Sequence, residues 1–421
     1  MPHRSRWQIA RTAAALVLLG GCAAGPPVRE LPEARTAAAA YHGLLTLRGD
    51  LHLHSSTGSF DARSCRGECT VLDAHQQLRA ARAAGLDFAA LTEHDRDPNA
   101  PHLRLDAELW RELQGICQEH SDADFQVLCG YEWTHSQKSC ASADRRGAPD
   151  WNHKIALLPP GAPEFCGVEC ETPDRLAEFL ARAGGVGFTP HPWRFELIDP
   201  PAGFPSFVTR DYFLYDSSDD EEGHPFIGAE VGPDFLPLRE EWAWPVVCEH
   251  PETAVRSRTV TLPEWSEALG AGKRLAALAT SDRTFDFIDF RQRTTLVFAT
   301  SRSPEAILEA LRARRTMAAY LEPFALRFSI GGVPVGRTAD AGPIRLDLEA
   351  EAGEVLEMKL RSPRGDLEVW RGDSGLGSRE IAVPADDPGP FWIEVYGRET
   401  DPVVGTPRTT ITSPIWLAAG R

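Results

Sequence analysis

Arg48-Gly49-Asp50-Leu51-His52-Leu53-His54-Ser55 is an apolar, strand-like stretch that carries two histidines two positions apart. Side chains at positions i and i+2 of a strand lie on the same face of the sheet, so His52 and His54 point toward the same surroundings. Two convergent imidazoles are half of a metal site. The pair alone is equally compatible with two exposed or hydrogen-bonded histidines, so the later segments have to decide.

Apolar runs alternate with helical patterns through most of the chain, from Leu47 to about Arg315. This alternation predicts a parallel α/β sheet or barrel. Thr172-Pro173 and Ser303-Pro304 each place a capping residue directly before a helix-compatible proline, which marks two helix starts. The predicted strands are Leu47 to His54, Leu86 to Thr92, Phe125 to Trp133, Lys154 to Leu158, Gly185 to Thr189, Phe226 to Val231 and Arg274 to Thr280. The predicted helices are Leu72 to Ala84, Ala107 to His120, Pro173 to Ala183, Pro263 to Leu269 and Pro304 to Arg314.

Six segments of this region place a histidine or a carboxylate at a strand boundary. In parallel α/β folds functional residues gather at the C-terminal ends of the strands, so these side chains would meet at one rim. One polar strand end is common, whereas six are difficult to explain as solvated caps. The residues are His52 and His54, the segment Glu93-His94-Asp95, Glu132, His153, His191 and Asp282.

The order and spacing of these segments resemble the PHP (polymerase and histidinol phosphatase) domain. The resemblance implies a distorted (β/α)7, TIM-like barrel over residues 46–318, with a metal cluster at the C-terminal ends of the strands. The β-rich tail, which we expect to form a small β-sandwich over residues 319–421, is similar to the tail of the CehA/McbA metallohydrolase subgroup. The segments that carry the resemblance are Asp50-Leu51-His52-Leu53-His54-Ser55, Gly85-Leu86-Asp87-Phe88, Leu91-Thr92-Glu93-His94-Asp95, Glu132, His153, His191, Ser281-Asp282 and, in the tail, Ile411-Thr412-Ser413-Pro414-Ile415-Trp416.

The resemblance implies two metal ions that share one carboxylate, Glu132. Neutral imidazoles with a bridging carboxylate suit Zn, Mn or Fe, and each imidazole then needs a hydrogen-bond acceptor for its other nitrogen. Asp50 and Glu93 are candidates for that supporting role, although a turn at the strand end explains Asp50 equally well. The implied ligands are His52, His54, Glu132 and Asp282 for the first ion, and Glu132, His153 and His191 for the second.

A third metal position is where the chain departs from the family pattern. The resemblance implies that Asp61 and His94 supply two of its ligands. The closing motif reads Asp282-Arg283-Thr284, so a threonine stands where the family has its last histidine. A threonine hydroxyl is a poor ligand for such ions, which predicts two tightly held ions and a third that is weak or absent. His94 would then act as a proton donor or a substrate contact.

Hydrolysis is the expected reaction, because two neighbouring divalent ions generate hydroxide from water and polarise the bond under attack. His94 or Asp95 would handle protons. Arg283 would steer an anionic group of a small-molecule substrate, with a surface ion pair as the alternative. A phosphoesterase is the first choice. A carbamate, amide or ester hydrolase and a metal-binding envelope lipoprotein with little turnover stay open, and Thr284 favours these two over a three-metal phosphoesterase.

Residues 1–22 have the layout of an export signal, in which arginines precede a short apolar core that ends in Leu19-Gly20-Gly21-Cys22. This ending resembles the bacterial lipobox, which implies a lipid anchor at Cys22; a plain secreted protein is the alternative. The Pro- and Ala-rich residues 23–45 are typical of a tether. We therefore expect a lipid-anchored protein of the bacterial cell envelope, with the outer membrane favoured because Ala23 follows the cysteine.

The composition agrees with export. The chain has nine cysteines, and the eight other than Cys22 form an even set whose expected state in an oxidising compartment is disulfide-bonded. Cys65 with Cys69 and Cys166 with Cys170 have a spacing that could instead hold a zinc ion. The net charge of −17 argues against a nucleic acid as a binding partner. The oligomeric state stays open.

Overall fold

The computed structural model describes most of the chain after residue 42. The described residues are 43–57, 72–97, 100–134, 153–162, 165–167, 170, 172–190, 194–197, 207–209, 224–232, 255–257, 261–282, 290, 292–340, 342–350, 353–372, 377–383, 387–400 and 407–418. The predicted export signal, the lipid-anchor residue Cys22 and nearly all of the predicted tether lie outside these ranges. No helix within them is long and apolar enough to cross a membrane.

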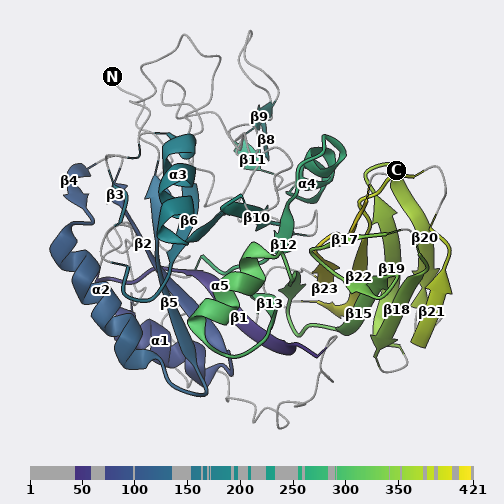
Figure 1. Cartoon of the computed structure of the whole chain (residues 1–421), viewed down its shortest axis with the longest axis horizontal. Helices are drawn as coiled ribbons and strands as arrows, with labels where there is room; N and C mark the ends of the chain where they lie inside the picture. The colour runs from purple at the N-terminus through teal and green to yellow at the C-terminus, as the bar shows by residue number, and fades with distance from the viewer. Residues whose placement is uncertain are drawn as a thin grey trace, which may run out of the picture. The chain divides into compact units, whose positions relative to one another are not determined.

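A large mixed sheet forms the centre of the fold (Figure 1). Each of the seven predicted strand runs contains a strand of this sheet, with boundaries that differ by a few residues. Two further strands of the sheet, β13 (Arg293–Ala299) and β14 (Thr316–Tyr320), were not predicted. The strands that correspond to the predicted runs are β1 (Leu45–Leu53), β2 (Phe88–His94), β5 (Gln126–Thr134), β6 (His153–Leu158), β7 (Val186–Thr189), β10 (Phe226–Glu230) and β12 (Ala276–Leu278).

The sheet is only partly parallel, which corrects the prediction of a parallel α/β sheet. Strands β1, β2 and β5 pair in parallel, as do β7, β10 and β12, whereas β6 is antiparallel to both β5 and β7. The strand β13 is also antiparallel to β1. An apolar strand has the same residue pattern in either direction, so the sequence could not reveal the reversal of β6. The reversal matters for the site because it brings His153, the first residue of β6, opposite Thr134 at the carboxyl end of β5.

Side chains, not a backbone ladder, connect the end of the sheet at β12 to β13 and β14. The Thr295 hydroxyl accepts a hydrogen bond from the Ala279 amide (3.1 Å) and donates one to the Ala279 carbonyl (2.8 Å). The Thr316 hydroxyl donates to the Ala277 carbonyl (2.9 Å). Within the described ranges no ladder joins β12 to this part of the sheet. The closed TIM-like barrel implied by the resemblance is therefore not confirmed, and the fold is described as mixed α/β with one large sheet.

Helices pack against the sheet at two apolar cores. Leu78, Trp110 and Leu180 place three helices on one core, and Leu308 places a fourth, α5, on another. Side-chain caps start these helices: Thr172 and Ser303 accept hydrogen bonds from the first turns of α3 and α5, as predicted. The described helices are α1 (Ala74–Ala83), α2 (Ala107–His120), α3 (Pro173–Ala183), α4 (Thr261–Gly270) and α5 (Pro304–Arg312).

The tail after Tyr320 is all-β within the described ranges, and two of its sheets enclose an apolar core of residues such as Phe328, Leu346 and Met358. One sheet has the order β16-β15-β18-β21. The other, β23-β22-β19-β20, continues the central sheet because β23 pairs with β14. The tail strands are β15 (Ala325–Ile330), β16 (Val333–Pro334), β17 (Thr338–Ala339), β18 (Ile344–Glu349), β19 (Val355–Ser362), β20 (Gly365–Arg371), β21 (Gly377–Ile381), β22 (Trp392–Thr400), β23 (Pro407–Thr412) and β24 (Trp416–Leu417). Short strands elsewhere are β3 (Arg96–Asp97), β4 (Ala100–Arg104), β8 (Arg194–Leu197), β9 (Phe207–Thr209) and β11 (Val255–Ser257).

Two disulfides are present in the described part of the chain. Cys117 at the end of α2 pairs with Cys129 in β5, and Cys166 pairs with Cys170. The second pair has the spacing for which a zinc site was the alternative, and the structure forms the disulfide. Both sulfur pairs are buried in the core beneath the helices.

Candidate metal centre

The end of β1 brings two buried histidines together. The side chains of His52 and His54 are fully buried, and their Nε2 atoms lie 3.0 Å apart. The ladder between β1 and β2 shifts its register between Asp50 and Leu53, so the strand is irregular where the histidines lie. Asp50 stabilises this irregular end, because its Oδ1 accepts the amides of His52 (3.2 Å) and Ser281 (3.1 Å). The Asp50 carboxylate therefore connects the end of β1 to Ser281, which follows β12.

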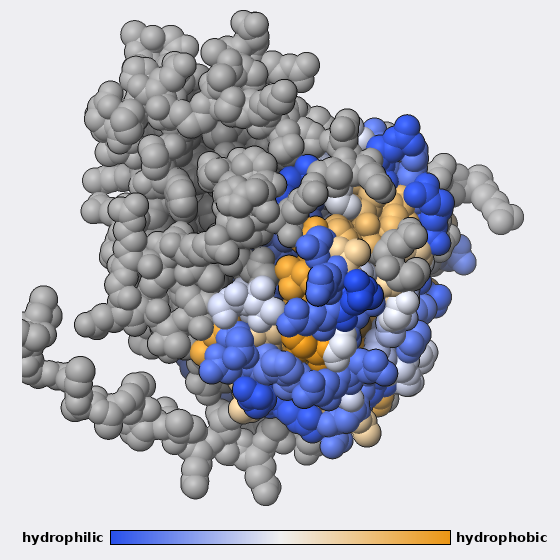
Figure 2. Space-filling view, turned by 90° about the vertical axis from the view of Figure 1, so that its left-hand side faces the viewer, coloured by the Kyte–Doolittle hydropathy of each residue, from blue (hydrophilic) through white to orange (hydrophobic). Residues whose placement is uncertain are grey.

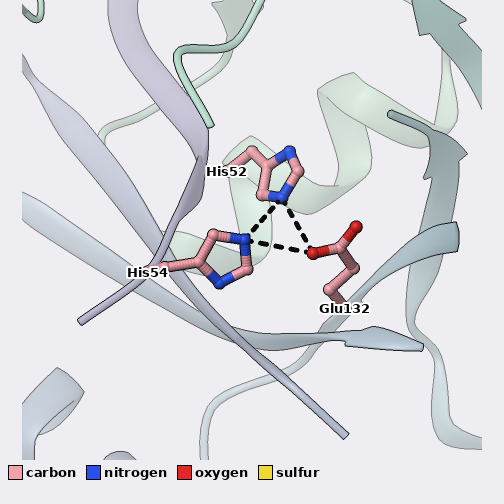
Figure 3. Close-up of side chains that lie close together, drawn as sticks. All are labelled: His52, His54 and Glu132. Atoms are coloured by element: carbon pink, nitrogen blue, oxygen red, sulfur yellow. Dashed lines mark hydrogen bonds and ion pairs between the residues drawn. The ribbon is translucent and has the colours of Figure 1, made fainter. Parts of the chain in front are cut away.

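Glu132 near the end of β5 faces both of these histidines. Its Oε2 lies 3.3 Å from His52 Nε2 and 3.1 Å from His54 Nε2. Figure 3 shows the two imidazoles and the carboxylate pointing toward one another. Three donor atoms that lie 3.0–3.3 Å apart can hold one cation. His52, His54 and Glu132 therefore form a buried group of possible metal ligands.

Two further histidines reach the same carboxylate from neighbouring strands. His94 Nδ1 lies 3.2 Å from Glu132 Oε2, and His153 Nδ1 lies 2.5 Å from Glu132 Oε1. The ladders account for this, because His94 is directly opposite Glu132 in β2 and β5, and His153 is opposite Thr134 in β5 and β6. These residues form a second group of possible ligands. Glu132 thus lies between two pairs of histidines.

Asp282 adds a second carboxylate to the first histidine pair. Its Oδ1 lies 3.5 Å from His52 Nε2 and 3.2 Å from His54 Nε2. The backbone at Asp282 has φ +50°, in the left-handed region that aspartate and asparagine enter more readily than most residues. The Asp282 side chain is 36% exposed, whereas the two histidines are fully buried. Asp282 therefore lies on the solvent side of the group.

Glu230 is a residue of this site that the sequence analysis missed. It ends β10, it is buried, and its Oε1 lies 3.4 Å from Nδ1 of His52 while accepting the hydroxyl of Thr280. A carboxylate on the second nitrogen of a ligand histidine fixes the tautomer and makes the first nitrogen a better ligand. The available signal was a single acidic residue at the end of the apolar run Phe226 to Val231.

The acidic residues after β2 hold strand ends in place. Glu93 accepts both the amide and the hydroxyl of Ser55, which follows His54. Asp95 accepts the Thr134 amide at 2.8 Å through Oδ1 and the Arg96 guanidinium at 3.0 Å through Oδ2. Burial raises the pKa of Asp95 to about 6, against the opposing effect of Arg96. The sequence-based role of Asp95 in proton transfer stays a prediction.

The histidines and carboxylates of the centre shift one another's pKa values. Burial disfavours the charged imidazole of His52, but the negative charges of Asp282 and Glu132 raise its pKa well above the ordinary value. Burial likewise opposes protonation of His54, and hydrogen bonds to Asp282 and Glu132 raise its pKa to about 10. Burial disfavours the Glu132 carboxylate, whereas the positive charges of its histidine neighbours hold its pKa well below the usual range. The group therefore attracts positive charge.

The donor set fits divalent transition metals. Imidazole nitrogens with carboxylate oxygens suit Zn, Mn and Fe, and the buried carboxylate at the centre requires positive charge around it. Four of the six predicted metal ligands form the first group: His52, His54, Glu132 and Asp282. His153 joins the second group, together with His94. The sixth predicted ligand, His191, lies outside the described residues, as do Asp61, Arg283 and Thr284.

No protein-family model matches the chain, and no curated protein matches it. A solved structure resembles it. That crystal structure, from Bacteroides vulgatus, is described as a two-domain protein containing a predicted PHP-like metal-dependent phosphoesterase. It is 18% identical in sequence, the alignment covers 88% of this chain and 96% of that chain, and the TM-score is 0.41. A similarity of this size supports no conclusion about activity, so the functional proposal rests on the site.

Proposed function

We propose that this chain is a metal-dependent hydrolase whose centre is organised by Glu132. One observation supports this most strongly: a single buried carboxylate contacts His52, His54, His94 and His153 within 3.3 Å. A carboxylate that is shared by two ligand groups is the arrangement that a two-metal hydrolase needs. The sequence resemblance to PHP-domain metallohydrolases agrees with this arrangement.

The first ion would be held by His52, His54, Asp282 and Glu132, and the second by Glu132, His153 and His191. Divalent ions in these positions would supply a nucleophile from water at neutral pH and Lewis-acid polarisation of the bond under attack. The contact between His94 Nδ1 and Glu132 supports a ligand role for His94 as well. Ligation through Nδ1 would leave the predicted proton-donor role to the other ring nitrogen, Nε2.

Other side chains of the chain orient this centre. Glu230 directs His52 through its Nδ1 atom, and Asp50 fixes the backbone at the end of β1. Asp95 holds the end of β5 next to Glu132 through the Thr134 amide. Because Asp282 is the ligand with the most exposed side chain among those described, a substrate would approach from the Asp282 side.

A phosphoesterase acting on a small molecule is the first choice of reaction class, and Arg283, next to Asp282, would bind an anionic group. A carbamate, amide or ester hydrolase is the alternative that the tail resemblance supports. The test is turnover of bis-p-nitrophenyl phosphate, p-nitrophenyl phosphate and 1-naphthyl carbamate by the metal-loaded full chain, with Glu132→Gln as the inactive control. If the protein hydrolyses neither of the two phosphate substrates, the phosphoesterase proposal is refuted. If it hydrolyses none of the three substrates, a metal-binding protein with little turnover is favoured.

We also propose that lipidation of Cys22 anchors the protein to the bacterial envelope, as its lipobox-like segment suggests. The experiment compares membrane fractionation of the natural chain with that of a Cys22→Ala variant. We expect the variant to be released from the membrane fraction. A processed Cys22→Ala protein that still sediments with the membranes would contradict the anchor.

A further inference from the structure

A second histidine cluster lies on α1 and α2, which are drawn side by side in Figure 1. His75 is in the first turn of α1, and Glu119 and His120 end α2. The His75 Nδ1 and His120 Nε2 atoms lie 2.9 Å apart, and Glu119 Oε1 lies 4.0 Å from His75 Nδ1. None of these residues belongs to the Glu132 centre.

The geometry of this cluster is close to that of a three-ligand metal site. Nitrogens bound to one tetrahedral zinc ion at about 2.0–2.1 Å are about 3.3 Å apart, so the two imidazoles need to separate by only a few tenths of an ångström. The Glu119 side chain is 67% exposed and can rotate toward the nitrogens. Two histidines and one glutamate leave a position open to water.

The cluster is accessible from solvent. The side chain of His75 is 38% exposed, and that of Glu119 is 67% exposed. The Glu119 carboxylate supplies a negative charge beside the two imidazoles. In the view of Figure 2, which faces the left-hand side of Figure 1, the coloured surface is hydrophilic with several hydrophobic patches. Because the side chains of His75 and Glu119 are exposed, an ion from solution can reach them.

We propose that His75, Glu119 and His120 form a separate surface site for a borderline divalent ion such as Zn²⁺, and that this ion ties α1 to α2. Nitrogen ligands favour Zn²⁺ and Cu²⁺ over Mn²⁺. The connection reaches the main centre through α1, because the side-chain amide of Gln77, two residues after His75, donates to the His54 carbonyl at 2.9 Å. Bound Zn²⁺ thus stabilises the helix that supports a ligand strand.

The test is to count zinc on the full chain after equilibrium dialysis against Zn²⁺, in wild type and in His75→Ala, His75→Gln and Glu119→Gln variants. The matched control is Glu112→Gln, which removes an exposed carboxylate from α2, the helix that carries Glu119. We expect wild type and the control to hold one zinc ion more per chain than the two His75 variants. We expect Glu119→Gln to bind that ion at least 10-fold more weakly, since loss of even a supporting partner weakens metal affinity by about 10–100-fold.

A thermal measurement separates binding from folding defects. Addition of Zn²⁺ should raise the melting temperature of wild type more than that of His75→Gln, because an ion that binds only the folded state stabilises it. His75→Gln retains a polar side chain of similar size, so it tests the site even if His75→Ala folds poorly. Equal zinc counts and equal thermal shifts in wild type and His75→Gln would overturn the proposal, whatever the activity of the main centre.

Discussion

Replacement of Glu230 by glutamine tests whether this buried carboxylate orients the first histidine pair. The substitution keeps the size of the side chain but removes its negative charge, so His52 Nδ1 loses a charged acceptor at 3.4 Å. The hydroxyl of Thr280 can still donate to the amide oxygen of the new side chain. The change is therefore directed at His52 and leaves the packing at the end of β10 in place.

The expected loss follows from the position of Glu230 behind a ligand. Carboxylates that hold the second nitrogen of a ligand histidine typically contribute about 10–100-fold to metal affinity, which equals about 1.4–2.7 kcal/mol. Glu132→Gln removes a shared ligand and should cost more. The effect of Glu230→Gln should also fall mainly on the ion held by His52 and His54, because its contact is with His52.

The assay is competition between the protein and a chelating dye for Mn²⁺ or Zn²⁺, with Glu267→Gln on the exposed side of α4 as the matched control. All chains carry His75→Ala, so that the proposed surface site adds no further class of ions. We expect Glu230→Gln to weaken one class of ions about 10–100-fold and Glu267→Gln to have no effect. Wild-type affinity in Glu230→Gln would refute the orienting role. An equal loss of both classes of ions would show that Glu230 acts on the whole fold, not on His52.

Three further predictions concern the strands that carry the ligands. Gly130→Ala should destabilise the chain by about 1–3 kcal/mol in urea unfolding, because a Cβ there would lie 2.5 Å from the Ala156 carbonyl oxygen; an unchanged midpoint would contradict the tight β5–β6 pairing. Trp133→Phe should cost about 1–3 kcal/mol in the same assay, since it removes the indole hydrogen bond to the Cys170 carbonyl (2.8 Å), and a neutral result would mean that the carbonyl finds another donor. Metal binding at neutral pH should release protons, because the pKa of His54 in the metal-free chain is raised to about 10 and a metal requires the neutral imidazole. Affinity should therefore increase with pH, and calorimetry in two buffers of different ionisation enthalpy that detects no proton release would refute this.

Much of the first ligand group could be predicted from the sequence, because its signals are local. His52 and His54 share a strand face by the period of two, and Glu132 lies near the end of an apolar run of strand length. The starts of α3 and α5 were equally accessible, since Thr172-Pro173 and Ser303-Pro304 are capping signals that act within one turn. Local patterns of this kind do not depend on how distant strands pair.

The direction of β6 and the role of Glu230 could not be predicted, because both depend on contacts between distant segments. The direction of β6 is set by its partners β5 and β7, and nothing within the run Lys154 to Leu158 records it. The omission of β13 has no such reason, because Arg293–Ala299 is itself rich in β-branched and apolar residues. Glu230 was missed because a lone carboxylate at a strand end acquires meaning only when His52 lies beside it.

The most direct test of the two-metal account is the metal content of wild type and Glu132→Gln after loading with Mn²⁺. The comparison uses the His75→Ala chain with and without Glu132→Gln, so that the proposed surface site contributes no ions. If Glu132 is shared by two ligand groups, the chain with Glu132 should hold about two ions and the Glu132→Gln variant fewer than about one. An equal count in the two proteins would contradict the role of Glu132 as the centre of the site.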